Sequence, residues 1–175
     1  MHNVNLGTGR DFAAELIRML DKNGALEPIE GTPREKLWQL TLDHRKWCSD
    51  NGLTRPRGIY TPSSVGWGSE MPELSTKWKA ASVRQVLEYL CHRICKLAET
   101  IEEPCDVHVA ATAAMELQNA EHLMDRCSYV FSVEESRQYH DSLMIHLRCM
   151  SRLASEAKSK GVLAWKLRFV YGLTW

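Results

Sequence analysis

The chain has 175 residues, and its 22 lysines and arginines balance 22 aspartates and glutamates, so the formal net charge is zero. This length suffices for one domain with its own hydrophobic core, and zero net charge excludes a protein-wide electrostatic attraction to nucleic acid or anionic membrane. No run of apolar residues approaches the roughly 18 that a membrane-spanning helix requires, so we expect a soluble single domain over residues 1–175 without a membrane span.

Two helices are predicted first, and each is ended by an asparagine-glycine pair, Asn23-Gly24 and Asn51-Gly52. The first covers residues 10–23. The second begins with a capping box, in which Thr32 caps the first turn, Pro33 fits the first helical position and Glu35 bonds back to the cap. The apolar residues at helical spacing are Phe12, Leu16, Ile17 and Leu20 in the first helix, and Leu37, Leu40, Trp47 and Cys48 in the second.

Residues 53–75 form the one long predicted loop, because prolines and glycines interrupt any regular element there. Loops beyond about 15 residues are uncommon in compact domains unless they are functional, mobile or packed. Its apolar residues are Ile59, Tyr60, Val65 and Trp67. This content favours an extended arm that packs on the rest of the protein.

Helical spacing returns after Thr76 and predicts three long helices. Pro104 ends the first, and the second begins near Asp106 with many alanines, which allow close approach to a neighbouring helix. The third opens with a capping box at residues 132–135 and closes at Lys160-Gly161. The residues predicted to face inward are Val83, Val86, Leu87, Leu90, Ile94, Leu97 and Ile101, then Ala110, Ala113, Ala114, Leu117, Met124 and Cys127, then Tyr139, Leu143, Leu147, Met150, Leu153 and Ala157.

The last segment, residues 162–175, alternates aromatic or aliphatic residues with basic ones, which is typical of an extended segment that lies across helices or docks on another chain. With the helices above, the sequence predicts an all-α fold. We expect an antiparallel helical bundle of about five helices, with its core bundle at residues 76–160, the long loop at 53–75 and an extended C-terminal tail.

The six cysteines fall mostly within helical patterns, which favours free thiols and a reducing intracellular compartment. Cys91 and Cys95 lie one helical turn apart, and Cys105 follows, so these three are the candidates for a metal or disulfide site. Their spacing is similar to half of the twin-cysteine motifs of small mitochondrial helical hairpin proteins, whose matching second pair Cys127 and Cys149 do not provide. Ordinary buried thiols are the main interpretation.

No motif indicates an enzyme or a cofactor. The nucleophile, phosphate-binding and dinucleotide-binding motifs are absent from the sequence. His140 and His146 are six residues apart and therefore lie on different helical faces, and the Glu-x-x-His pattern of di-iron bundles does not occur. We therefore expect no catalytic residues and no cofactor.

Two segments, Lys77-Trp78-Lys79 and Trp165-Lys166-Leu167-Arg168, place basic residues beside tryptophan, as in surfaces that contact phosphates and stack on bases. The stretch from Met71 to Arg84, MPELSTKWKAASVR, resembles a helical segment of open reading frames repeated in dinoflagellate genomes and derived from mobile elements. Those frames continue with a run similar to residues 165–168, followed by proline-lysine-x-histidine, whereas here Phe169-Val170-Tyr171 follows. The resemblance, over about residues 70–168, implies a helical scaffold reused for packing.

The leading functional hypothesis is a noncatalytic helical interaction module, an accessory or structural subunit of a larger assembly with a protein partner. Neutral charge, the lack of catalytic motifs and two aromatic-rich nonhelical segments favour it. The partner-docking candidates are Tyr60, Trp67, Trp165, Phe169 and Tyr171. The alternatives are a mobile-element-derived nucleic-acid-associated domain and a small metal-binding helical protein.

Overall fold

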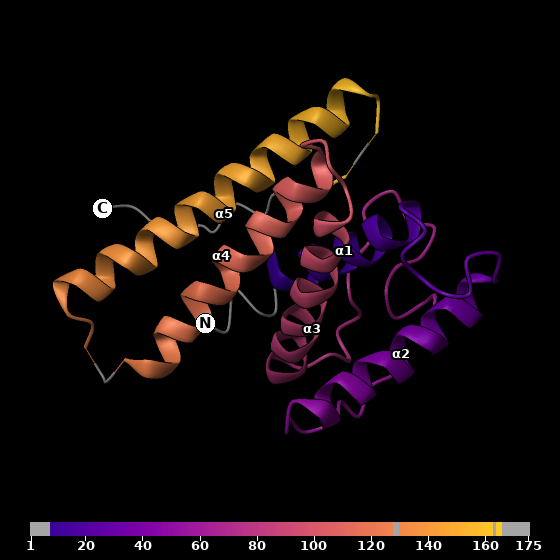
Figure 1. The fold of residues 1–175 in the computed structure, drawn as a ribbon, viewed down its shortest axis with the longest axis horizontal. Helices are drawn as coiled ribbons and strands as arrows, with labels where there is room; N and C mark the ends of the chain where they lie inside the picture. The colour runs from indigo at the N-terminus through magenta and orange to yellow at the C-terminus, as the bar shows by residue number, and fades with distance from the viewer. Residues whose placement is uncertain (1–7, 128–129, 163, 166–175) are drawn as a thin grey trace.

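The computed structural model describes residues 8–127, 130–162, 164 and 165, and within this part of the chain it forms five α-helices and no strand (Figure 1). The helices are α1 (Gly9–Lys22), α2 (Pro33–Asp50), α3 (Ala80–Glu99), α4 (Asp106–Arg126) and α5 (Val133–Ser159). This result confirms the predicted all-α class. None of the five is long and apolar enough to cross a membrane.

The helices pack as a chain of neighbours. α4 and α5 form a long antiparallel hairpin, α3 packs on α4, and α1 and α2 both contact α3 (Figure 1). The end of the hairpin where α4 meets α5 extends beyond α3. α3 therefore occupies the centre of the molecule and touches elements from both halves of the sequence.

The first helix lies in the core. Its predicted apolar face is confirmed, since Phe12, Leu16 and Leu20 have no exposed surface, and complete burial of each stabilises the fold by roughly 1.5–3 kcal/mol. The charged residues Arg10 and Glu15 are also buried. The core thus extends beyond the predicted bundle at residues 76–160 and includes α1.

Both predicted capping boxes form. The backbone N–H of Thr32 donates to Glu35 Oε2 at 2.8 Å, and the backbone N–H of Ser132 donates to Glu135 Oε2 at 2.8 Å. Each hydroxyl in turn accepts from the backbone N–H of its glutamate. Caps of this kind stabilise a helix by about 1 kcal/mol, which explains why the sequence predicts the starts of α2 and α5 correctly.

The long loop packs as an arm, as predicted, but not with all of the expected residues. Tyr60 and Val65 are buried, whereas Ile59 is 42% exposed. Trp78 is buried as well, and its indole lies so close to Gly58 that a Cβ there would come within 2.8 Å of the ring. Because the turn before α3 carries Trp78 into the core, α3 begins at Ala80, four residues after the predicted start.

The buried face of α5 is confirmed in part, since Met150 and Leu153 are buried as predicted and Leu143 and Ala157 pack against the core. Ser142 and His146 are buried, whereas Leu147, predicted to face inward, is 39% exposed. The His146 ring packs edge-on against Phe12 with centroids 5.1 Å apart, and its Nδ1 atom is hydrogen bonded to the Ala113 carbonyl at 2.9 Å. This polar contact adds His146 to the buried face of α5, and hydrophobic spacing does not predict it.

Candidate functional site

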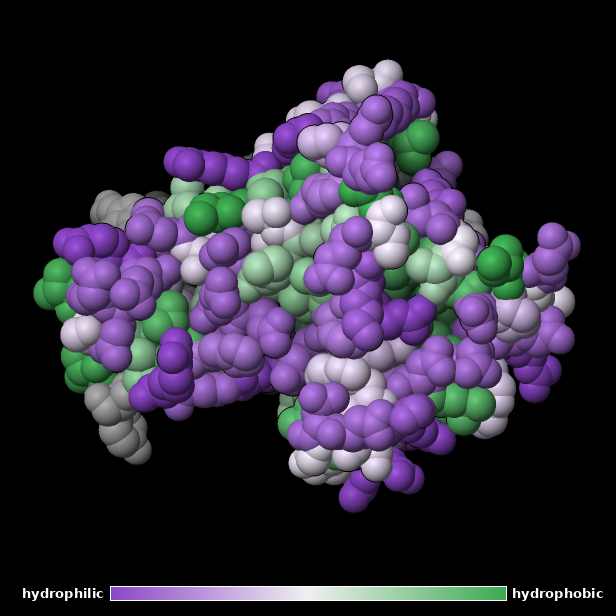
Figure 2. Space-filling view, in the orientation of Figure 1, coloured by the Kyte–Doolittle hydropathy of each residue, from purple (hydrophilic) through white to green (hydrophobic). Residues whose placement is uncertain are grey.

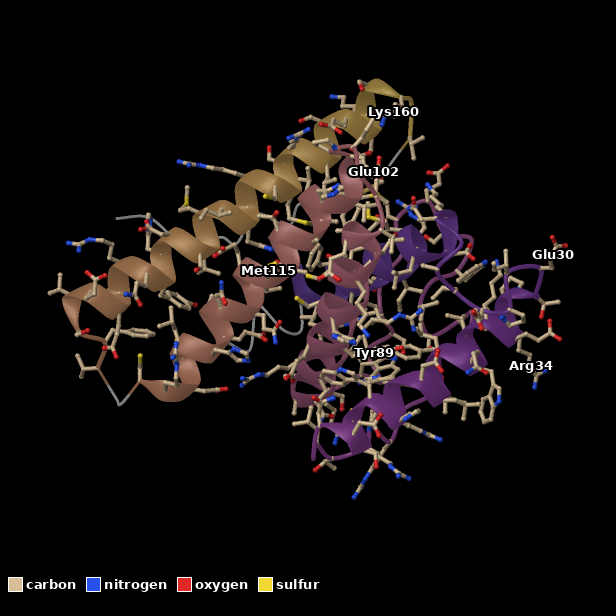
Figure 3. All side chains as sticks on the ribbon, in the orientation of Figure 1. Glu30, Arg34, Tyr89, Glu102, Met115 and Lys160 are labelled. Carbon is tan, nitrogen blue, oxygen red and sulfur yellow. The ribbon has the colours of Figure 1, made fainter. Side chains whose placement is uncertain are left out.

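A groove of about 860 Å³ lies between α2 and α3 and reaches the side of α4; we call it the α2–α3 groove. Tyr89 and Met115, both labelled in Figure 3, line it from α3 and α4. On the face seen in Figure 2, hydrophobic residues (green) gather between hydrophilic ones (purple). The other lining residues are Asp43, Lys46, Trp47, Asp50, Asn51, Glu88, Cys91, His92, Arg93, Cys95, Lys96, Glu99 and Gln118.

A stack of four rings, Trp78, Tyr60, His44 and Tyr89, lies behind this groove and joins the long loop to α2 and α3. Trp78 and Tyr60 have ring centroids 5.3 Å apart, and Tyr60 and His44 have centroids 5.9 Å apart. The closest pair is His44 and Tyr89, at 4.5 Å with planes 7° apart. Tyr89 also lines the α2–α3 groove, so the ring stack ends at one wall of this groove.

The ring stack is uncharged near neutral pH. Burial lowers the pKa of His44 to about 4, an effect that the nearby backbone of Gln85 partly offsets. The Tyr60 hydroxyl is hydrogen bonded to His44 Nδ1 at 2.9 Å, and burial raises the pKa of both Tyr60 and Tyr89, for Tyr89 to about 12. A fully buried neutral imidazole has no access to a substrate, so His44 supports the fold.

Arg93 connects Tyr89, which lines the groove, to residues of neighbouring segments. Its guanidinium donates to the Tyr89 hydroxyl at 2.8 Å and to the Ala25 carbonyl at 2.6 Å, and it lies 3.4 Å from Asp43 Oδ2 on α2. Tyr89 and Arg93 are one turn apart on α3, which brings the cation over the ring. The contact with Asp43 joins α3 to α2, and the contact with Ala25 joins α3 to the segment that precedes α2.

The structure separates the three candidate cysteines. Cys91, which is buried, and Cys95, which is partly exposed, line the α2–α3 groove together. A hydrogen bond between them lowers the pKa of Cys95 to about 7 and, together with burial, raises the pKa of Cys91. Cys105 instead lies at the start of α4 and lines a different cavity of about 440 Å³ beside Glu15.

All six cysteines are free thiols. Among the residues that the structure describes, no three histidine, cysteine, aspartate or glutamate side chains gather to hold a metal ion. The sequence-based set of Cys91, Cys95 and Cys105 therefore does not form one site.

Of the five predicted docking aromatics the structure describes three, and two of these are buried. Tyr60 is 3% exposed and Trp165 is 7% exposed, while Trp67 is partly buried against the core. The Trp165 backbone N–H donates to Glu15 Oε1 at 2.8 Å. Tyr60 and Trp165 thus stabilise the fold and present no docking surface. Phe169 and Tyr171 lie outside the described residues.

The tryptophans of the two segments that place basic residues beside tryptophan are also buried. Trp78 is buried against Tyr60, so its ring has no free face for a nucleic-acid base, although Lys77 and Lys79 are exposed on either side. Trp165 is buried too, and residues 166–168 lie outside the described part of the chain.

Of the residues that line the groove, sequence reasoning singled out Cys91 and Cys95 as a candidate site but not Tyr89, Arg93 or Met115. The spacing of Tyr89 and Arg93, one turn apart, is a signal for a ring–cation pair on one helix face. Nothing in the sequence around Met115 indicates that it lines a groove. Its place opposite α3 depends on how α4 packs, and the spacing of residues within one helix does not predict this packing.

Comparison with protein-family models, with curated proteins and with solved structures finds no match to this chain. The function is therefore argued from the chain's own residues.

Proposed function

We propose that this protein is a noncatalytic helical interaction module, an accessory or structural subunit of a larger assembly, and that the α2–α3 groove binds a segment of the partner protein. The observation that supports this most is the character of the groove lining. Met115 is 50% exposed there, the partly buried Trp47 contributes aromatic surface, and charged residues of both signs surround them. Aromatic residues, methionine and arginine are the types enriched at protein interfaces.

The dimensions of the groove suit a short helix. The lining residues of α3 run from Glu88 to Glu99, about three turns or roughly 16 Å of helix. An amphipathic partner helix would lay its apolar side on Trp47 and Met115 and place charges against the acidic and basic residues of the rim.

The fixed walls also support a binding role. The ion pair of Arg93 with Asp43 and the stacked rings of His44 and Tyr89 join α2 to α3 in the unbound chain. A preformed groove loses less conformational entropy on binding than a flexible one, which favours affinity for a partner segment.

Site-specific photo-crosslinking tests this proposal. A benzophenone side chain replaces Lys46, which is exposed at the rim of the groove, and in a matched variant it replaces Lys158, which is exposed on α5. In the native host, we expect the Lys46 position to give one discrete crosslinked protein that also copurifies with the unmodified chain. The Lys158 position should give none of it.

The substitution Lys96→Glu reverses a charge on the exposed surface of the groove without touching the core. It should lower both the crosslinking yield at position 46 and the copurification. Equal crosslinking at positions 46 and 158, or a partner unaffected by Lys96→Glu, would contradict the proposed groove.

A further inference from the structure

Three sulfur-bearing side chains line the α2–α3 groove. Cys91 and Cys95 line it from successive turns of α3, and Met115 lines it from α4. Figure 3 shows Met115 at the middle of α4, beside α3. Thiolates and thioethers are soft ligands, so this grouping is of interest for metal binding even though the third residue is a methionine.

The register of the two helices places Met115 of α4 near the level of Cys91 of α3. The guanidinium of Arg84 lies 3.7 Å from the carboxylate of Glu121, and the two helices run in opposite directions. Seven residues forward from Arg84 is Cys91, and seven residues back from Glu121 is Ala114, the neighbour of Met115. The pairing of the helices therefore brings Met115 to the level of Cys91.

The spacing of the two cysteines favours a bridging ion over a disulfide bond. Side chains one turn apart on a helix have Cβ atoms about 5–6 Å apart, whereas a disulfide requires about 3.5–4.5 Å, so a direct bond would distort α3. A metal ion adds two metal–sulfur bonds of about 2.3 Å each to the span and leaves the helix unchanged.

We propose that Cys91, Cys95 and Met115 form a binding site for Cu(I). Zinc prefers four tetrahedral ligands of cysteine, histidine or carboxylate type, and among the described residues no third such group joins the two thiols. Cu(I) is a soft cation that two thiolates and a thioether satisfy. Each thiol that coordinates the ion releases its proton to solvent.

The surroundings of the site suit a bound soft cation. Cys91 is 4% exposed, so the inner side of the site is shielded from water, while the partly exposed Cys95 and Met115 leave an entry from the groove. Two thiolates with one Cu(I) carry a net negative charge, and the groove lining holds both basic side chains, Arg93 and Lys96, and acidic ones, Glu88 and Glu99. This inference does not depend on the proposed protein partner.

Competition for Cu(I) tests the site. The full-length reduced chain is titrated without oxygen with Cu(I) held by the chromophoric chelator bicinchoninate. We expect the chain to remove a single Cu(I) from the chelator. The variants Cys95→Ser and Cys91→Ala should each bind more than about tenfold more weakly, because even groups behind metal ligands contribute about 10–100-fold to affinity.

Met115→Leu keeps the size and apolar character of the side chain and removes only the sulfur. In this variant, X-ray absorption should count one sulfur neighbour fewer around copper. Matched controls, Cys149→Ser and Met144→Leu on α5, should bind as the unmodified chain does, and circular dichroism checks that every variant is folded. Absence of Cu(I) uptake by the folded chain would overturn the proposal. So would equal uptake by a Cys91→Ala/Cys95→Ser double variant, which would show adventitious binding at other thiols.

Discussion

His44 is the residue at which burial, ring stacking and hydrogen bonding meet. Its imidazole lies between the rings of Tyr60 and Tyr89 and has no exposed surface. Its pKa falls from an ordinary 6.5 to about 4 because burial disfavours the charged form. Burial lowers the pKa of His146 in the same way.

This pKa shift links stability to pH. Between about pH 6.5 and 4 the unfolded chain binds a proton at residue 44 that the folded chain does not, so stability is full above pH 6.5 and is lost as the pH falls. We expect the free energy of unfolding in urea to fall by about 2 kcal/mol between pH 7 and pH 5 because of His44. The variant His44→Gln should lose this part of the pH dependence.

The exposed His140 provides the matched control, since His140→Gln removes an imidazole from the surface. It should leave the pH profile of stability unchanged. A profile that is the same in the unmodified chain and in His44→Gln would show that His44 does not titrate as its burial requires.

Tyr60→Phe isolates the hydrogen bond of the ring stack. The ring remains in place, but His44 Nδ1 loses its partner inside the core, which should cost about 1–3 kcal/mol in urea unfolding. Tyr139→Phe alters a partly buried ring on α5 and should cost far less. Equal effects of the two substitutions would remove the special role given to the His44–Tyr60 pair.

At the scale of the helices, the features that could be predicted from sequence are local. Thr32 with Glu35, and Ser132 with its glutamate, specify helix starts through contacts within four residues. The burial of Ser142 and His146 on α5 could not be predicted in this way. It depends on His146 meeting Phe12 and the Ala113 carbonyl, which come from two other helices.

The burial of α1 in the core gives the clearest prediction at the scale of the helices. Leu16→Ala removes a side chain with no exposed surface and should destabilise the protein by about 2–5 kcal/mol. Leu42→Ala makes the same change on α2 at a side chain that is 40% exposed, and its cost should be well below 2 kcal/mol. Thermal or urea unfolding of the pair measures the difference. Similar costs would place α1 outside the core.

At the scale of the whole molecule, Trp165 joins the end of the described chain to its first helix. Its ring packs 6.1 Å from that of Phe12, and its backbone, with a φ of 58°, is held by the hydrogen bond to Glu15. Trp165→Ala should cost about 3–5 kcal/mol of stability, whereas Trp38→Ala, at a ring that is 49% exposed, should cost little. If the two variants unfold alike, the C-terminal contact is not part of the core.

The α2–α3 groove shows why the site was harder to predict than the fold. Its lining comes from three helices, and the long loop separates α2 from α3. The amphipathic spacing that predicts each helix does not indicate how the helices pack. Tyr60 and Trp165, two of the predicted docking aromatics, lie instead in the core, because large rings near a hydrophobic core gain more from burial than from exposure. Cys91 and Cys95 could be placed on one face because their spacing lies within a single helix.

Hydrogen exchange on the native complex tests the central claim, partner binding in the α2–α3 groove, most directly. Exchange in peptides that cover residues 43–51 and 88–99 is compared between the complex purified from the host and the isolated chain. Binding in the groove predicts slower exchange in both segments and unchanged exchange over residues 133–148 of α5. Protection confined to α5, or native material that contains the chain alone, would contradict the proposed role.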